Sequence, residues 1–167
     1  MFCRSLLSEE RHLAAKLDRR CVKVDKKRIP DAAAKQAVED NIAEMKRLAE
    51  EREDKMFEMK EDITRLCDVL DMDMNATSIA LLLPEGHQEG SLRPADLEAV
   101  AATLQDLQGR MAARRDEVGA MVEQVRGLYD KLAVVQEERI DLGADLEELC
   151  RTDAMENVAE ELARLRR

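Results

Sequence analysis

Two long stretches of the chain repeat apolar residues at alternating intervals of three and four positions. The first stretch runs from Val38 to Leu70, and the second runs from Leu97 to Val135. Mostly polar and charged residues stand between the apolar positions, which gives the repeat of helices that pack along one seam. A strand would instead alternate every second residue, and neither stretch does so. The pattern therefore predicts two long α-helices.

The predicted helix-packing seam consists of the apolar residues at the repeating positions. These are Val38, Ile42, Met45, Met56, Met59, Ile63, Leu66, Leu70, Leu97, Val100, Leu104, Leu107, Met111, Val118, Met121, Val125, Leu128 and Leu132. If the chain reverses near residue 83, the two stripes pair in antiparallel register. The first three pairs are then Leu70 with Leu97, Leu66 with Val100, and Ile63 with Leu104. We therefore expect an antiparallel helical hairpin.

Each stripe has one polar break, Arg52 in the first and Arg114 in the second. The predicted register places these two residues opposite each other as a polar layer. Two guanidinium groups cannot both be buried there without anions. We expect them to reach solvent or to pair with Glu53, Asp116 or Glu117, and to help fix the register.

The predicted fold class is all-α, an elongated antiparallel helical hairpin or coiled-coil rod of spectrin-like type. Three parts are expected: a basic N-terminal helix at 1–29, the hairpin at 30–136 with a loop at 72–94, and short C-terminal helices at 137–167 leading to a module that is not included. Pro30 and Pro94 mark the starts of the two long helices, because proline is tolerated in the first turn. The apolar run Ile79–Leu83 in the loop is expected to fold back over the helix ends.

Two shorter amphipathic patterns flank the hairpin. Leu13, Leu17 and Val24 form a stripe within roughly residues 5–28, which predicts a helix there. Near the other end, Thr152 and Asp153 precede Glu156 in the manner of a helix N-terminal capping signal.

Charge is distributed unevenly along the chain. The formal net charge is −10, the charged fraction is 38% and the aromatic fraction is only 2%, a composition typical of long helices. This balance excludes a chain-wide surface for nucleic acid or anionic membrane. Residues 1–28 hold nine Lys and Arg against four acids, or +5, and the remainder carries −15. Contact with an acidic polymer would therefore have to begin at the N-terminal end.

No motif predicts catalysis or a cofactor. The four cysteines are widely spaced, which argues against a disulfide scaffold or zinc site and favours a reduced, intracellular chain. His12 and His87 stand far apart, and no phosphate-binding loop or nucleophile motif occurs. The longest uncharged run, Met74–Pro84, is too short to span a bilayer. We expect a protein that is not an enzyme and that binds no metal or cofactor.

Four stretches in order resemble one protein family. Leu66–Asp73 reads L-C-D-V-L-D-M-D, Leu97–Glu117 contains Arg114-Arg115, Leu128–Leu132 is followed by Glu137-Glu138-Arg139, and Val158–Leu165 reads V-A-E-E-L-A-R-L. The set resembles the antiparallel microtubule crosslinkers. This family comprises the plant sixty-five-kilodalton microtubule-associated proteins, the yeast anaphase spindle elongation protein and the animal protein regulator of cytokinesis. The resemblance is closest to the plant branch.

The resemblance implies a homodimeric rod that bundles antiparallel microtubules in the spindle midzone, the phragmoplast or the cell cortex. Kinesin-type motors are further candidate partners, whereas neither nucleic acid nor membrane is expected. The family's microtubule-binding module would lie beyond these residues. An alternative is an unrelated coiled-coil adaptor or tether, in which the seams pair between chains instead of within one. A small helical enzyme is a third alternative, but it would need a concave polar site that the sequence does not suggest.

Overall fold

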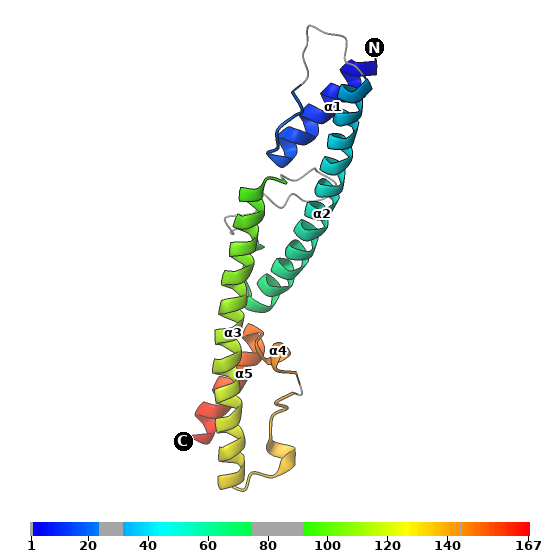
Figure 1. The fold of residues 1–167 in the computed structure, drawn as a ribbon. Helices are drawn as coiled ribbons and strands as arrows, with labels where there is room; N and C mark the ends of the chain where they lie inside the picture. The colour runs from blue at the N-terminus through cyan, green and yellow to red at the C-terminus, as the bar shows by residue number, and fades with distance from the viewer. Residues whose placement is uncertain (1, 24–31, 75–91, 144) are drawn as a thin grey trace. The chain divides into compact units, whose positions relative to one another are not determined.

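The computed structural model describes residues 2–23, 32–74, 92–143 and 145–167 (Figure 1). These residues form helices joined by turns and extended segments, and none of the described residues forms a strand. The helices are α1 (Phe2–Leu17), α2 (Ala32–Leu70), α3 (Pro94–Lys131), the 3-10 helix η3 (Gln136–Glu138), α4 (Leu146–Leu149) and α5 (Thr152–Leu165). The predicted all-α fold class is confirmed.

The two long helices occupy the two apolar stripes. Pro94 is the first residue of α3, a position where the missing N–H group has no intrahelical partner to lose. Helix α2 begins at Ala32, close to the predicted start at Pro30, which itself lies outside the described residues. Most of the predicted loop, including the apolar run Ile79–Leu83, also lies outside them.

The chain divides into two compact units. Unit 1 comprises Met1–Glu61 and Ile79–Ala102, and unit 2 comprises Asp62–Ser78 and Thr103–Arg167. Both long helices contribute residues to both units, because the division falls within α2 and within α3.

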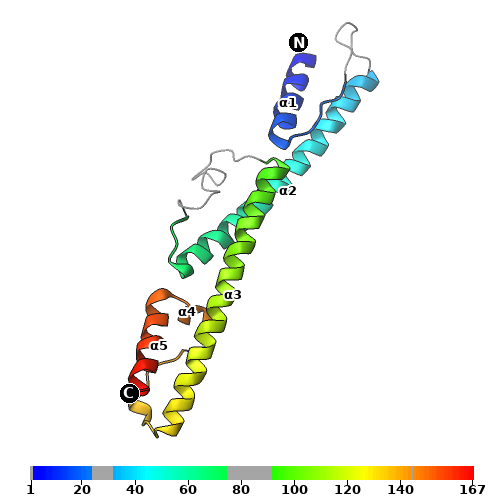
Figure 2. The same ribbon diagram turned by 90° about the vertical axis from the view of Figure 1, so that its left-hand side faces the viewer.

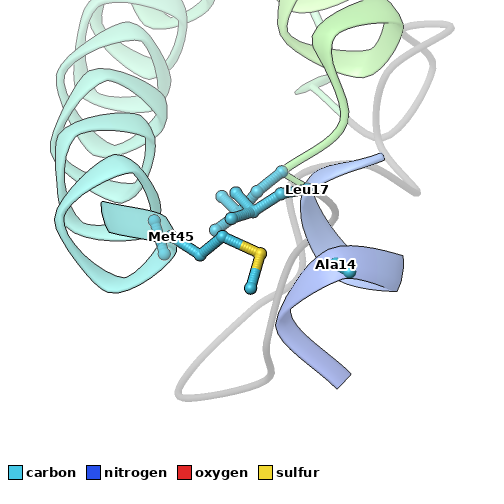
Figure 3. Packing of buried hydrophobic residues seen from close by; sticks show 5 residues of the cluster. Ala14, Leu17 and Met45 are labelled. Atoms are coloured by element: carbon cyan, nitrogen blue, oxygen red, sulfur yellow. The ribbon is translucent and has the colours of Figure 1, made fainter. Parts of the chain in front are cut away.

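In unit 1, α1 packs against α2 through a small aliphatic core. The core cluster contains Ala14, Leu17, Met45, Ala49 and Leu92, with Leu13 and Leu48 packed against it. Figure 3 shows Leu17 of α1 and Met45 of α2 pointing toward each other. Burial of these side chains supplies the main stabilisation of the packing.

Ion pairs fix the direction of α1 on α2. Glu9 pairs with Lys46 at 2.7 Å, and Lys16, two turns further along α1, pairs with Glu53 at 2.8 Å. The residue numbers of the paired residues increase along both helices, from 9 to 16 in α1 and from 46 to 53 in α2. The two helices therefore run in the same direction, as Figures 1 and 2 show. The described residues 18–23 turn back along α1, since the Val22 N–H reaches the Glu10 carboxyl group.

Unit 2 combines the end of α2, most of α3 and the C-terminal helices. Its buried hydrophobic residues are Ile63, Leu66, Cys67, Val69, Leu107, Met111, Val118, Val122, Val125, Tyr129, Leu149, Cys150, Val158 and Leu162. Two ion pairs join the last turns of α2 to the region of α4: Arg65 with Glu147 at 2.6 Å, and Asp68 with Arg151 at 2.9 Å.

The predicted antiparallel register is wrong in unit 2. Leu66 lies with Met111 around one shallow hollow, and the Val69 carbonyl accepts a hydrogen bond from Arg114 at 3.3 Å. The prediction placed Val100 opposite Leu66. The last turns of α2 and the facing part of α3 instead run in the same direction (Figure 2). Apolar contact is non-directional, so one repeating stripe fits another in either direction and at several shifts.

The first three helices end in the same way. Asp18, Asp71 and Ala133 each follow the last turn with positive φ, at 54°, 55° and 49°. The next residue then donates its N–H to a carbonyl five positions back: Arg19 to Ala14, Met72 to Cys67, and Val134 to Tyr129. This is the Schellman arrangement, which satisfies carbonyls that the helix leaves free. Helix α1 consequently ends at Leu17, well before the predicted end near residue 28.

Candidate functional site

The residues of the predicted seam differ in how deeply they are buried. The buried ones are Val38, Ile42, Met45, Met56, Ile63, Leu66, Val100, Leu107, Met111, Val118 and Val125. The half-buried ones are Met59, Leu70, Leu97, Leu104, Met121 and Leu128. Leu132 is 56% exposed. Towards the end of α3, Val122 and Tyr129 occupy buried positions, because a straight helix drifts away from a strict seven-residue repeat.

Arg52 joins three segments of unit 1. Its Nη1 donates to the Leu17 carbonyl at 3.0 Å and to the Leu92 carbonyl at 2.6 Å. Leu17 is the last residue of α1, so its carbonyl has no intrahelical donor, and a cation is favourable at a helix C-terminus. Glu53, one of the partners suggested for the arginines, pairs with Lys16 instead.

Arg114 makes the corresponding contact in unit 2. Its Nη1 donates to the Val69 carbonyl in the last turn of α2 at 3.3 Å. Its Nη2 donates to the Thr152 hydroxyl oxygen at 3.3 Å. These acceptors replace the suggested partners Asp116 and Glu117. The two arginines belong to different units, so a polar layer formed by Arg52 and Arg114 stays a prediction.

The start of α5 also differs from the prediction. The N-cap residue is Arg151, which makes no side-chain capping hydrogen bond, and Thr152 is already the first helical residue. The Thr152 hydroxyl binds Arg114. A true side-chain cap occurs at α4, where the Asp145 carboxylate accepts from the Glu147 N–H, as short polar side chains do at helix starts.

A buried carboxylate organises unit 1. Glu10 is only 1% exposed, and its Oε1 accepts from the Val22 N–H and from the Asn41 side-chain amide, each at 2.7 Å. These hydrogen bonds offset part of the cost of burying the charge. They also fasten the returning segment 18–23 to both helices. The sequence contained a signal for this residue, because Glu10 occupies an apolar position in the spacing that includes Ala14 and Leu17.

A second buried carboxylate organises unit 2. Glu161 is 6% exposed and accepts from the Tyr129 hydroxyl at 2.7 Å. Arg164 binds the same carboxylate through Nε and Nη2, both at 2.6 Å. The hydrogen bonds from Arg164 hold the pKa of Glu161 below its usual value, against the opposing effect of burial. The carboxylate is therefore charged and firmly paired at neutral pH.

Tyr129 extends this network to the turn after α3. Its hydroxyl oxygen accepts from the Ile140 N–H at 3.0 Å, and burial is the main cause that raises the pKa of the phenol. The Arg139 guanidinium lies 5.2 Å from the ring centroid, within the range of a cation–π contact. Arg139 also donates to the Val134 carbonyl just beyond α3.

The described residues favour packing over reactive chemistry. Among them, no group of three or more His, Cys, Asp or Glu side chains is placed to hold a metal ion. Every buried polar side-chain atom in this part of the chain has a hydrogen-bond partner. Cys67 and Cys150 are buried, and burial raises the pKa of both thiols, which disfavours the reactive thiolate. No described helix is long and apolar enough to cross a membrane.

Comparison with known proteins identifies a family. The model of the microtubule associated protein (MAP65/ASE1) family matches residues 2–167, which includes all the described helices of both units. A comparison with curated proteins gives no match. The family resemblance seen in the ordered motifs is confirmed. Because the match covers nearly the whole sequence, the chain belongs to the MAP65/ASE1 family of microtubule-associated proteins.

Proposed function

We propose that this chain is a helical spacer segment of a protein that crosslinks and bundles antiparallel microtubules. The family match over residues 2–167 carries this proposal. The two long helices support it, since α2 has 39 residues and α3 has 38. At the standard rise, each helix is roughly 60 Å long. Helices whose ends are held by arginine and glutamate hydrogen bonds suit a mechanical, non-catalytic role.

In this proposal, the principal microtubule contact comes from a C-terminal module outside these residues. Microtubule surfaces are acidic, and residues 29–167 carry a net charge of −15. Like charges repel at low and moderate ionic strength. The long helices would therefore hold binding modules at a distance from each other instead of providing the main binding surface.

Family membership is the basis for our proposals on oligomeric state, location in the cell and further partners. We propose that the protein acts as a homodimer in the cytoplasm, on the microtubules of the spindle midzone, the phragmoplast or the cortex, during mitosis and cytokinesis. Kinesin-type motors are proposed as further partners. A homodimer gives two binding modules per particle, which is the minimum needed to join two microtubules.

Microtubule bundling tests the proposal directly. The 167-residue chain is compared with a version extended downstream in the same reading frame, using low-speed sedimentation and fluorescence microscopy at physiological ionic strength. We expect the extended chain to form bundles and the 167-residue chain to form none. Bundling by the shorter chain would contradict the placement of the binding module. Failure of both chains to bind or bundle would favour the unrelated adaptor or tether.

A further inference from the structure

Five basic side chains of unit 1 are exposed on α1 and on the segment that follows it. They are Arg4, Arg11, Arg19, Arg20 and Lys23, and we call them the basic strip. None of the five makes any of the ion pairs found among the described residues. Exposed arginines are usually paired only weakly. What distinguishes this strip is that four exposed arginines and one exposed lysine lie within residues 4–23 of an otherwise acidic chain.

The acids of the same stretch are already engaged by α2. Glu9 pairs with Lys46 at 2.7 Å. Glu10 is buried and accepts from Val22 and Asn41. Its carboxyl group therefore faces the interior of the unit, away from the solvent around the strip. Among the described residues of this stretch, Asp18 is the acid that lies exposed beside these cations, so the exposed charges of residues 4–23 are mostly basic.

The returning segment also borders a small hollow of about 320 Å³. Asp18, Arg19 and Arg20 form one side of it. The opposite side belongs to α2, with apolar and polar atoms of Asn41, Glu44, Met45 and Leu48. Two acids, Asp18 and Glu44, and two arginines line this hollow, so its own formal charges balance and the excess of basic groups lies along the exposed side chains of the strip.

We propose that the basic strip is a second, weak contact for the acidic surface of a microtubule. This inference rests on the proposed function, because the family supplies the partner and the strip supplies the complementary charge. The same strip on a second copy fits less well, because two basic strips repel each other. The contact depends on exposed charges, so it is screened by salt. Each chain carries one such site, and salt screening at physiological ionic strength leaves it too weak to hold two microtubules together.

Charge-reversal variants of the 167-residue chain test the strip. The strip variant carries Arg11→Glu, Arg19→Glu and Arg20→Glu. The matched control carries Arg115→Glu, Lys131→Glu and Arg167→Glu, which change the net charge equally at exposed positions of unit 2. Circular dichroism checks that both variants fold. High-speed microtubule co-sedimentation at low ionic strength then measures affinity, and a parallel measurement follows binding to a fluorescent polyglutamate peptide by anisotropy.

We expect the strip variant to bind microtubules and the peptide about tenfold more weakly than the unmodified chain. The control should lose about twofold or less, and added salt should remove the difference between them. Equal losses in the two variants would overturn the proposal, as would the absence of binding by the unmodified chain. Strip-dependent binding to the peptide alone would overturn the assignment to microtubules. The bundling test of the extended chain is separate, because the strip variant is expected to retain bundling there.

Discussion

Units 1 and 2 contain the same two kinds of polar contact, but the hydrogen-bond donors to the buried glutamate differ between them. In each unit, an arginine that interrupts an apolar stripe binds a carbonyl in the last turn of the preceding helix, and a buried glutamate ties distant segments together. In unit 1, Glu10 accepts from neutral groups, an amide N–H and an asparagine side chain. In unit 2, Glu161 accepts from the charged Arg164 and from a phenol. Arg164 therefore adds an ionised donor to the carboxylate of Glu161, whereas both donors to Glu10 are neutral.

The hydrophobic cores of the two units also differ in how much polar chemistry they include. The core cluster of unit 1 contains only aliphatic side chains and methionine. Unit 2 buries the large ring of Tyr129, with its hydroxyl fully used as donor and acceptor. Unit 1 therefore depends mainly on its apolar contacts, whereas unit 2 depends more heavily on one polar network.

Truncating the core of unit 1 should have the largest effect. Leu17 is fully buried, and Leu17→Ala should destabilise unit 1 by about 3 kcal/mol through lost burial and the cavity left behind. Hydrogen exchange at α1 amides measures this loss. Leu132→Ala is the control, because this exposed side chain should contribute about 0.5 kcal/mol or less. Equal effects of the two substitutions would contradict the assigned core.

Replacing each buried glutamate by glutamine should destabilise the two units to different extents. Glu161→Gln removes the charged acceptor of Arg164 and should cost about 2 kcal/mol. Glu10→Gln keeps an oxygen acceptor for neutral donors and should cost about 1 kcal/mol. Urea unfolding followed by Tyr129 fluorescence reports on unit 2, since the chain has one Tyr and no Trp. Hydrogen exchange reports on unit 1. A larger loss from Glu10→Gln would reverse the comparison.

Acid should weaken unit 2 through Glu161. The folded-state pKa of this carboxyl is lowered, chiefly by Arg164. Its contribution to stability is therefore present above the unfolded pKa of a glutamate and is lost as pH falls through the lower folded pKa. Tyr129 fluorescence during urea unfolding at several acidic pH values measures the effect. The Glu161→Gln variant should show a flatter pH dependence, and an unchanged slope would exclude this residue as the cause.

Relieving backbone strain at the end of α3 should have the smallest effect, and it should be favourable. Ala133 has φ of 49°, a region that glycine adopts without cost. Ala133→Gly should stabilise unit 2 by about 0.5–1 kcal/mol, measured by the Tyr129 signal. Asp18→Gly in unit 1 should gain less, because aspartate tolerates this conformation better than alanine does. A destabilising Ala133→Gly would show that the terminal turn is not strained.

Much of the fold could be predicted from the sequence because helix periodicity is a local property. The stripes located α2 and α3, and Pro94 marked the first residue of α3. The partner of each stripe could not be predicted in the same way. Leu66 packs equally well against any apolar row of suitable spacing, and its actual neighbour Met111 belongs to the same repeat as the expected Val100. The direction is fixed instead by specific hydrogen bonds, such as that from Arg114 to Val69.

The polar sites were only partly predictable. Arg52 and Arg114 were noticeable as interruptions of a stripe, yet each binds a backbone carbonyl of the preceding helix, and a backbone carbonyl carries no sequence signal. Glu10 and Glu161 stand at apolar spacing within their helices and could have been recognised as buried acids. Tyr129 lies one position beyond a predicted seam residue, and it is buried because α3 drifts from the strict repeat. Its pairing with Glu161 depends on the packing of α5, which no local pattern specifies.

The most direct test of the account is hydrogen exchange followed by mass spectrometry on Arg52→Ala and Arg114→Ala. We expect Arg52→Ala to speed exchange at the end of α1 and in residues 18–23, because the free energy of local opening there should fall by about 1–2 kcal/mol. Arg114→Ala should produce a similar increase at the end of α2 and the start of α5. Unchanged exchange in both variants, or increases at the same amides, would contradict the claim that each arginine holds the preceding helix within its own unit.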